Sequence, residues 1–389
     1  MCVWCVEWER FPYRRGCFVY QLSFPDWLCN EPARVYVSPD QSLAQPFTFY
    51  ATFDSDSECS YIPTGTSVLL PASSYARDNL RKPRLPGTIR DVAADCGGYV
   101  ASRIWGEYRY SLEKYVNWLR SFSPRWAATM DYCCEPDLLQ VTTARQEKTT
   151  TNAYQAFQHF KQESFAWVPT LQGWEPSDYK RHALTLKPLI EEMATYYANN
   201  DAWRVGVGTL CRRDDVVAVQ AILNAVREVL PSVPLHLWGI KLDALRSINL
   251  SQVTSSDSAV WHQSMYARDE IEIKARQAGM SMRRYKVLVN LPDYEAKVQQ
   301  AVAESSRVQS AQHDQVLLQQ ARRVLKAQGW TINVRTRRNR LYVYGSRRRG
   351  RRVEQVSICP VSELSNWLVV QDSGPVVSLP GLLSCTTVQ

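Results

Sequence analysis

The sequence predicts an α/β barrel of the (β/α)8 type, followed by a small arginine-rich α/β appendix. Between about residues 65 and 265, short apolar runs alternate with longer amphipathic segments, which is the order expected of a parallel sheet covered by helices. The candidate strands are numerous and no Gly-x-Gly-x-x-Gly turn follows the first of them, which favours a closed barrel over an open doubly wound sheet. Polar residues also gather after these strands, where a barrel keeps its active site.

Six strands and a weaker seventh account for the apolar runs. The six are Ser67–Leu70, Val92–Ala94, Ala127–Met130, Phe165–Thr170, Arg204–Val207 and Leu235–Ile240, and the seventh ends near Ser255. The segments between them, such as SLEKYVNWLRSF and DDVVAVQAILNAVREVL, carry apolar residues at three- and four-residue spacing, which is typical of helices with one buried face. The first 60 residues are aromatic, rich in proline and irregular, so they are predicted only as an elaboration packed on the barrel.

The chain after residue 310 has the pattern of a second unit. HDQVLLQQARRVLKAQG predicts an amphipathic helix that ends at Gly329, and WTINVRT, RLYVYGS and VEQVSICPV predict three strands joined by arginine-rich turns. We therefore divide the chain into residues 1–310, a barrel with an irregular N-terminal elaboration, and residues 311–389, a basic α/β appendix.

Positive charge is concentrated in this appendix. The chain has a net charge of +8, and residues 331–352 contain nine arginines and no acidic residue. Because the planar fork of arginine donors matches phosphate oxygens, a polyanionic partner is expected. The candidate nucleic-acid contacts are Arg347, Arg348, Arg349, Arg351 and Arg352. The alternative is a solvated tail or a patch that serves only localisation.

The composition indicates a cytoplasmic protein without a membrane span. No run approaches the roughly 20 apolar residues that a span needs, and the opening MCVWCVEWERFPYRR is charged where a signal peptide would be apolar. Eleven cysteines, an odd number, lack the spacing of a secreted disulfide framework, so reduced thiols are expected. A zinc site of Cys2, Cys5, Cys17 and Cys29 is the less favoured alternative to buried free cysteines. We expect neither a metal nor a cofactor.

Five strand ends carry the polar residues. They are Asp95 with Gly97 and Gly98, Asp131, Gln172 with Gly173, Gly206 with Gly208, and Asp257. Each alone has an ordinary explanation, because an aspartate after a strand is often a helix N-cap and a glycine there often makes the turn. Five such ends in order, with three carboxylates and an amide, are hard to explain as five caps. They predict an active site at one end of the barrel.

Five short motifs follow one another in this region: DCGGY, MDYCC, LQGW, GVGTL and SSDSAVW. They resemble, in the same order, the Asp-Ser-Gly-Gly-Phe, Asp-x-Cys, Gln-Gly-Gly, Gly-Gly and nucleophile segments of the tRNA-guanine transglycosylase family. The resemblance is closest to the DNA-acting branch of that family, the DpdA-type 7-deazaguanine DNA transglycosylases. It covers about half of the chain.

The resemblance implies a role for each matched residue. Asp257 would attack C1′ of the nucleotide and hold it as a covalent glycosyl-enzyme. Asp95 would act as general acid and base at the departing and arriving purine nitrogen. Asp131 and Gln172 would hydrogen-bond the purine edge, and Gly206 would contact the six-position oxygen through its backbone groups.

Residues beside these motifs complete the expected pocket. Because the target base must leave the helix to reach it, Tyr99 and Trp174 are candidates for stacking on the base, with ordinary core packing as the alternative for Tyr99. Gly98 and Gly173 lie next to the matched carboxylate and amide, where backbone can approach a ligand closely.

Two further features lie near the expected site. Arg212 and Arg213, at a predicted helix start, are candidates for holding phosphates, with a solvated pair as the alternative. His262 follows Asp257 by five residues and lies next to Trp261, so we expect a packed or capping histidine and not a catalytic base or metal ligand.

Two departures separate the chain from the transfer-RNA branch of the family. That branch carries a zinc site of Cys-x-Cys-x-x-Cys and a distant His after the nucleophile, whereas no cysteine occurs here between Cys211 and Cys359. The nucleophile motif also reads Ser-Asp-Ser and not Phe-Asp-Cys. Both features resemble the DNA branch.

The resemblance therefore implies a base-exchange enzyme that replaces guanine in DNA with a 7-deazaguanine such as preQ0. Its expected partners are DNA and that base. Three alternatives stay open: exchange on transfer RNA or another RNA, a catalytically inactive barrel that only binds nucleic acid, and a glycosidase that hydrolyses the bond without replacing the base. Phosphate contacts alone do not distinguish DNA from RNA.

Overall fold

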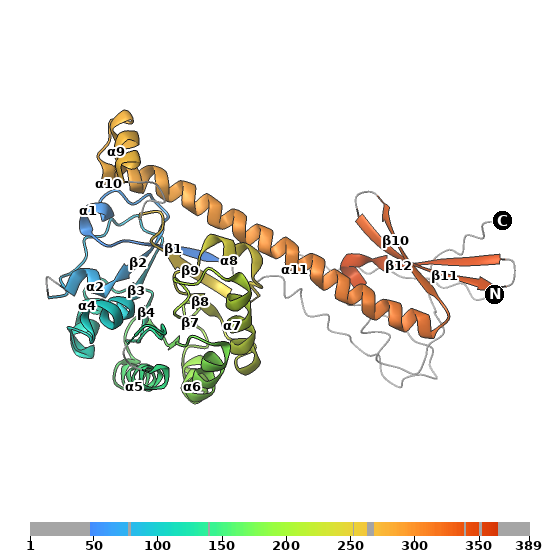
Figure 1. Cartoon of the computed structure of the whole chain (residues 1–389), viewed down its shortest axis with the longest axis horizontal. Coiled ribbons are helices and arrows are strands. Elements are labelled where there is room, and N and C mark those ends of the chain that lie inside the picture. The colour runs from blue at the N-terminus through green and yellow to red at the C-terminus, as the bar shows by residue number, and fades with distance from the viewer. Residues whose placement is uncertain are drawn as a thin grey trace, which may run out of the picture. The chain divides into compact units, whose positions relative to one another are not determined.

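The computed structural model describes residues 47–76, 79–138, 141–251, 253–262, 268–337, 340–349 and 352–364. Its elements are a ring of parallel strands with helices outside it, a long helix, and a three-stranded antiparallel sheet (Figure 1).

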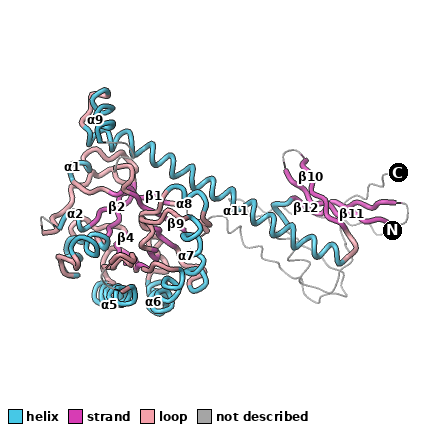
Figure 2. Tube along the Cα trace, in the orientation of Figure 1, coloured by secondary structure: helices cyan, strands magenta, loops and turns pink. Residues whose placement is uncertain are grey.

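Parallel strands form a closed barrel. They are β1 (Thr48–Thr52), β2 (Ser67–Pro71), β3 (Asp91–Asp95), β4 (Trp126–Ala128), β5 (Ala166–Val168), β6 (Thr170–Leu171), β7 (Val205–Val207), β8 (Leu235–Leu237) and β9 (Val253–Ser258). Their order in the sheet is β5-β4-β3-β2-β1-β9-β8-β7-β6. Only Pro169 separates β5 from β6, so one stretch of chain pairs with β4 through its first part and with β7 through its last. The two edges of the sheet are thus continuous in the chain, and the predicted α/β barrel is confirmed (Figure 2).

The first strand corrects one expectation from the sequence. Residues 48–52 belong to the N-terminal segment that was predicted to be only an elaboration, but β1 pairs with β2 on one side and with β9 on the other. Tyr50 and Ala51 are fully buried. The Tyr50 hydroxyl donates to Asp91 at 2.6 Å and accepts from the Trp126 indole at 2.9 Å. β1 is therefore a barrel strand, and without it β2 and β9 would be unpaired edges.

Helices flank the barrel (Figures 1 and 2). They are α1 (Asp56–Cys59), α2 (Ala72–Tyr75), α3 (Gly98–Val100) continued by η2 (Ala101–Trp105), α4 (Leu112–Arg120), α5 (Thr142–Phe160), α6 (Pro176–Tyr196), α7 (Val216–Val229), α8 (Leu242–Ser247), α9 (Arg268–Gln277) and α10 (Met282–Tyr285) continued by η3 (Lys286–Asn290). Of these, α9 and α10 lie near the start of the long helix that follows them (Figure 1). The side chains of Ser111 and Asp215 accept backbone N–H groups at the starts of α4 and α7, and Glu175 with Asp178 forms a capping box at α6. Within the described ranges, no helix has both the length and the apolar character needed to cross a membrane.

The long helix α11 (Leu291–Ala327) links the two parts of the fold. Near its middle it packs on α8, where the Ser305 hydroxyl donates to the Ile248 carbonyl at 2.7 Å. Its last turns pack on a sheet of order β10-β11-β12, made of β10 (Thr331–Arg337), β11 (Arg340–Arg349) and β12 (Arg352–Pro360), which is followed by η4 (Val361–Glu363). The predicted helix and three strands are present. The helix begins earlier than predicted, and the boundary drawn at residue 310 falls inside it.

Candidate active site

Three carboxylates meet at one end of the barrel. Asp95 is the last residue of β3, Asp131 follows β4, and Asp257 lies near the end of β9. The charges of Asp131 and Asp257 both act on Asp95. The fold therefore brings the three aspartates predicted at strand ends into one site, because the carboxyl ends of parallel strands lie at the same end of a barrel.

The pKa of Asp95 lies well above the ordinary value of an aspartate. Burial, the negative charge of Asp131 and, to a lesser degree, that of Asp257 raise the pKa of Asp95 to about 7, against a hydrogen bond from the Gly97 backbone that lowers it. A carboxyl group with this pKa exists in both forms at neutral pH, so it can give and take a proton.

Asp131 is held by side chains from two directions. The Cys96 thiol donates to its Oδ1 at 3.0 Å, and the Gln172 amide nitrogen donates to its Oδ2 at 2.5 Å. Burial raises the pKa of Asp131, and both of these hydrogen bonds oppose that shift. Gly98 is required beside it, because a Cβ there would lie 1.9 Å from the Asp131 carboxylate.

Gln172 is fixed in one orientation. Its Oε1 accepts from the Thr209 hydroxyl at 2.5 Å while its Nε2 donates to Asp131, which settles which end of the amide is the donor. Its backbone carbonyl accepts from Gln146 at 2.6 Å. Thr209 has a φ of +53°, which is uncommon for a β-branched residue. It is a site residue that the sequence reasoning missed, because nothing in its neighbourhood signals that conformation.

Asp257 is 8% exposed, and its two oxygens differ. Oδ1 accepts from the Gly239 backbone N–H at 2.8 Å and contacts His236 Nε2 at 3.3 Å. Oδ2 accepts from the Thr52 hydroxyl at 3.3 Å. Since two donors contact Oδ1 and only Thr52 contacts Oδ2, Oδ2 is the oxygen better placed to act as a nucleophile.

A chain of hydrogen bonds beneath Asp257 defines the protonation of His236. Arg204 donates to the Ser255 hydroxyl oxygen at 2.6 Å, and that hydroxyl lies 2.8 Å from His236 Nδ1. Because the Asp257 carboxylate only accepts hydrogen bonds, the single proton of a neutral ring sits on Nε2, facing Asp257, and Nδ1 accepts from the Ser255 hydroxyl. Burial lowers the pKa of His236, which keeps the ring neutral. The sequence reasoning missed this residue, since LHLWG reads as an apolar strand.

The other predicted pocket residues lie in varied environments. Tyr99 is 41% exposed, so it is not a core residue. The Gly206 amide donates to the Pro169 carbonyl at 2.8 Å within the barrel sheet, so the donor role implied for its backbone is already taken. Gly173 faces the start of α6, where an added Cβ would lie 2.8 Å from Asp178. Glycine at this position therefore allows the backbone to pack closely against the start of α6.

The two arginines expected to hold phosphates are placed differently from each other. Arg213 lies over the Trp174 ring, with its Cζ 4.2 Å from the ring centroid, and donates to the Trp174 carbonyl. Arg212 is exposed and lies 4.0 Å from Asp137. Arg213 therefore orders Trp174, and Arg212 is the better placed of the two for a phosphate.

His262 is engaged in ion pairs. Its ring nitrogens lie 3.4 Å from Asp54 and 3.0 Å from Glu58, and these acids raise its pKa to about 9. The ring also packs on Trp261. This matches the expected packed histidine.

The arginines of the appendix do not form one patch. Side chains alternate along β11, so Arg348 points to the face opposite that of Arg347. Arg347 lies over the buried Trp330, with its Cζ 4.2 Å from the ring centroid. Arg352 begins β12, and Arg351 lies outside the described residues.

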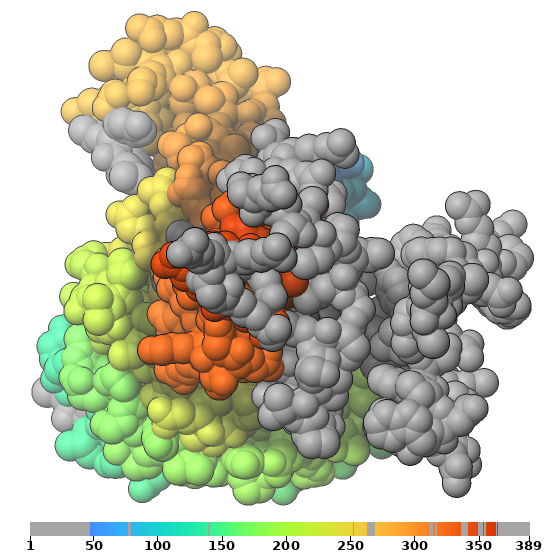
Figure 3. Space-filling model, turned by 90° about the vertical axis from the view of Figure 1, so that its right-hand side faces the viewer, coloured from blue at the N-terminus to red at the C-terminus, as the bar shows by residue number. Residues whose placement is uncertain are grey.

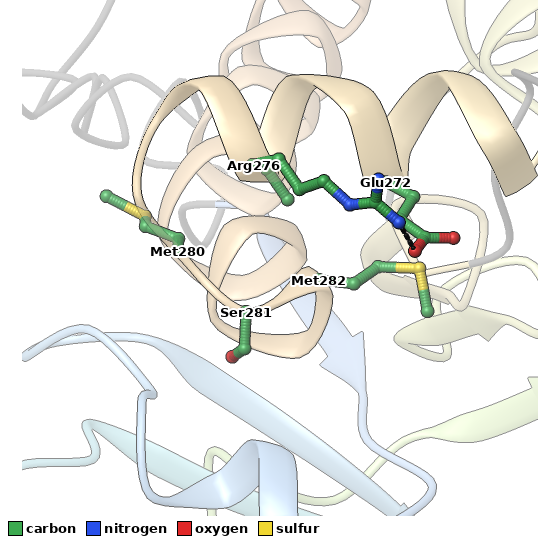
Figure 4. Close-up of a pocket in the computed structure, with 6 residues that line it drawn as sticks. Glu272, Arg276, Met280, Ser281 and Met282 are labelled. Carbon is green, nitrogen blue, oxygen red and sulfur yellow. Dashed lines mark hydrogen bonds and ion pairs between the residues drawn. The ribbon is translucent and has the colours of Figure 1, made fainter.

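A hollow at the turn between α9 and α10 is lined by Glu272, Arg276, Met280, Ser281 and Met282 (Figure 4). The charged residues lining it, Glu272 and Arg276, pair with each other at 2.5 Å. None of the three carboxylates lines this hollow, so it is not the candidate site.

Within the part of the chain that the structure describes, no three His, Cys, Asp or Glu side chains are arranged to hold a metal. The four cysteines considered as zinc ligands, Cys2, Cys5, Cys17 and Cys29, lie outside the described residues.

A comparison with protein families matches residues 51–319 to the family described as DpdA, DeoxyPurine in DNA protein A. The match covers more than half of the chain and contains Asp95, Asp131, Gln172 and Asp257. A comparison with curated proteins finds no match.

The hydrogen-bond chain predicts the tautomer of His236. Nitrogen NMR of protein labelled at histidine should show a neutral ring with its proton on Nε2 at pH 6.5, where an ordinary histidine is half protonated. The signal is assigned by its loss in His236→Gln. A charged ring at that pH, or a proton on Nδ1, would contradict the chain from Arg204 to Asp257.

Proposed function

Since the chain belongs to the DpdA family, we propose that it replaces guanine in DNA with a 7-deazaguanine base such as preQ0, through a glycosyl intermediate on Asp257. The family supports a transglycosylase with DNA as its substrate. The base that enters and the role of each residue are our proposal.

The observation that carries the proposal is the unequal environment of the carboxylates. Asp257 has one oxygen tied by a backbone N–H and a histidine, and the other is less engaged. Asp95 has a pKa of about 7. A barrel that only bound nucleic acid would gain nothing from burying acids near a polyanion, because each buried charge costs free energy.

In the first half-reaction, Oδ2 of Asp257 attacks C1′ of the target nucleotide. The new C1′–O bond forms as the C1′–N9 bond breaks, and the electron pair of the broken bond leaves with the guanine. Protonated Asp95 gives its proton to the departing base, so that guanine leaves neutral. His236 and Gly239 hold the other oxygen of Asp257 in place during the attack.

In the second half-reaction, the incoming base gives the proton of its ring nitrogen to ionised Asp95. That nitrogen attacks C1′, and Asp257 leaves as a carboxylate with the electron pair of the C1′–O bond. Asp95 ends protonated, as it began. A group with a pKa near the working pH serves both steps, which a carboxyl group of ordinary pKa would do poorly.

Asp131 and Gln172 are proposed to read the Watson-Crick edge of the purine. In the structure the Gln172 amide donates a hydrogen bond to Asp131, so a bound base would share or replace that hydrogen bond. The carboxylate accepts N–H groups, and the amide nitrogen donates to the six-position oxygen. A pocket that recognises only this edge makes no specific contact with the seven position of the base, so it accepts a nitrile group there.

Base exchange is tested with purified protein, labelled preQ0, and either guanine-containing duplex DNA or transfer RNA, followed by nucleoside mass spectrometry. We expect the label as a deazaguanine deoxynucleoside. Asp257→Ala should abolish labelling while DNA binding persists, because the variant lacks only the nucleophile. Asp243→Ala, which changes an exposed aspartate, is the matched control and should label normally.

The other outcomes of this experiment are decisive as well. Label only in RNA would move the substrate to RNA, and release of guanine without label would indicate hydrolysis. Normal labelling by Asp257→Ala would refute the nucleophile assignment.

The pKa of Asp95 predicts opposite pH dependences for the two half-reactions. Guanine release in a single turnover needs protonated Asp95, so its rate should fall as pH rises through about 7. Incorporation from the preformed intermediate needs ionised Asp95, so its rate should rise over the same range. Asp95→Asn should lose both dependences and slow each step by about 10²- to 10⁴-fold. A guanine-release rate that is flat between about pH 6 and 8 would rule out Asp95 as the acid.

A further inference from the structure

The sheet of β10, β11 and β12 has two faces of different chemistry. One face packs on α11 through residues that include Val334 and the fully buried Val343. Because side chains alternate along a strand, Arg335, Tyr342 and Tyr344 point to the opposite face. In Figure 3, the end of α11 and these strands appear as orange and red atoms, with the red atoms visible in separate patches.

The face away from α11 combines aromatic rings with positive charge. Tyr342 and Tyr344 are half-buried at its centre, where the register places them opposite Arg335 and Asn333 of β10. The Arg335 guanidinium lies 5.7 Å from the Tyr344 ring centroid, within cation–π range. Arg348 continues the same face along β11, and both arginines are exposed. Among the side chains of this face that the structure describes, none is acidic.

We propose that this face binds unpaired DNA, with bases stacked on Tyr342 and Tyr344 and phosphates held by Arg335 and Arg348. The choice of DNA rests on the proposed function. The inference adds to it a second binding site, outside the barrel, and the form of DNA that this site takes.

The arrangement favours an unpaired strand over a duplex. A ring can stack only on the face of a base, and in a duplex those faces are covered by neighbouring base pairs, so that only base edges and phosphates are offered. Two rings two residues apart on one strand stand about 7 Å apart, since a strand rises about 3.4 Å per residue. Aromatic residues on an open sheet face bind successive unstacked bases in this way.

The chemistry also fits the reaction proposed for the barrel. A guanine can be exchanged only after it leaves the stack, which disrupts pairing locally. A site that holds unpaired DNA would stabilise the opened form. Arg347, on the other face over Trp330, takes no part in this site.

The test measures binding of the full chain to a labelled oligo-dT by fluorescence anisotropy. This DNA contains no guanine, so it isolates the sheet from base exchange. Tyr342→Ala with Tyr344→Ala should weaken binding by at least about tenfold, because stacking contributes about 1–3 kcal/mol per base. Tyr342→Phe with Tyr344→Phe keeps both rings and should stay within about twofold of the parent. Tyr342→Leu with Tyr344→Leu keeps apolar side chains without an aromatic face and should weaken binding as the alanine pair does.

The arginines are tested by the dependence of binding on salt. Arg348→Gln should reduce the slope of log K against log salt by about 0.7, the value for one phosphate contact on a single strand. Arg347→Gln is the matched control on the opposite face and should leave the slope unchanged. Equal slopes for Arg348→Gln and the parent would overturn the phosphate role.

Three results would overturn the inference: unchanged oligo-dT affinity in the alanine pair, tighter binding to a duplex of the same length, or preference for oligo-rU, which would assign the face to RNA. The result is independent of base exchange. If labelling of DNA fails while oligo-dT binding depends on both tyrosines, the proposed function falls and this site stands.

Discussion

The candidate site depends on placing three carboxylates together in a partly buried space. Burial and like charge both favour the protonated form, so the site must supply donors or leave a proton in place. Asp131 receives the Cys96 thiol and the Gln172 amide, and Asp257 receives Gly239 and His236. Asp95 instead has a pKa of about 7. The unequal supply of donors gives three residues of one type different environments, which underlies the nucleophile, base-reading and proton-carrying roles that we propose for them.

The parts of this site that were predictable carry a local signature. Asp95 and Asp131 each follow an apolar run, Gln172 precedes a glycine, and Asp257 follows the weaker, polar strand, so the pattern alone placed all four at strand ends. A parallel barrel then brings its strand ends together whatever their separation in sequence. For the same reason the α/β barrel itself was predictable, because alternation of strand and helix is visible along the chain.

The parts that were missed are set by contacts between distant residues. The sequence of Thr48–Thr52 has no distinct pattern, so only its pairing with β2 and β9 identifies it as a strand. His236 resembles any inward-facing strand residue until Ser255 and Asp257 are placed beside it. The arginine run likewise reads as one patch, and only the strand register separates Arg347 from Arg348. None of these facts is encoded in neighbouring residues.

The proposed mechanism requires a covalent bond between Asp257 and C1′ of the substrate nucleotide. The most direct test incubates the protein with guanine-containing duplex DNA while released guanine is removed, then quenches in acid, digests the DNA and the protein, and sequences the peptides by mass spectrometry. We expect a deoxyribose adduct on Asp257 that is absent from the Asp257→Ala variant. An adduct on another residue, or base exchange without any adduct, would contradict it.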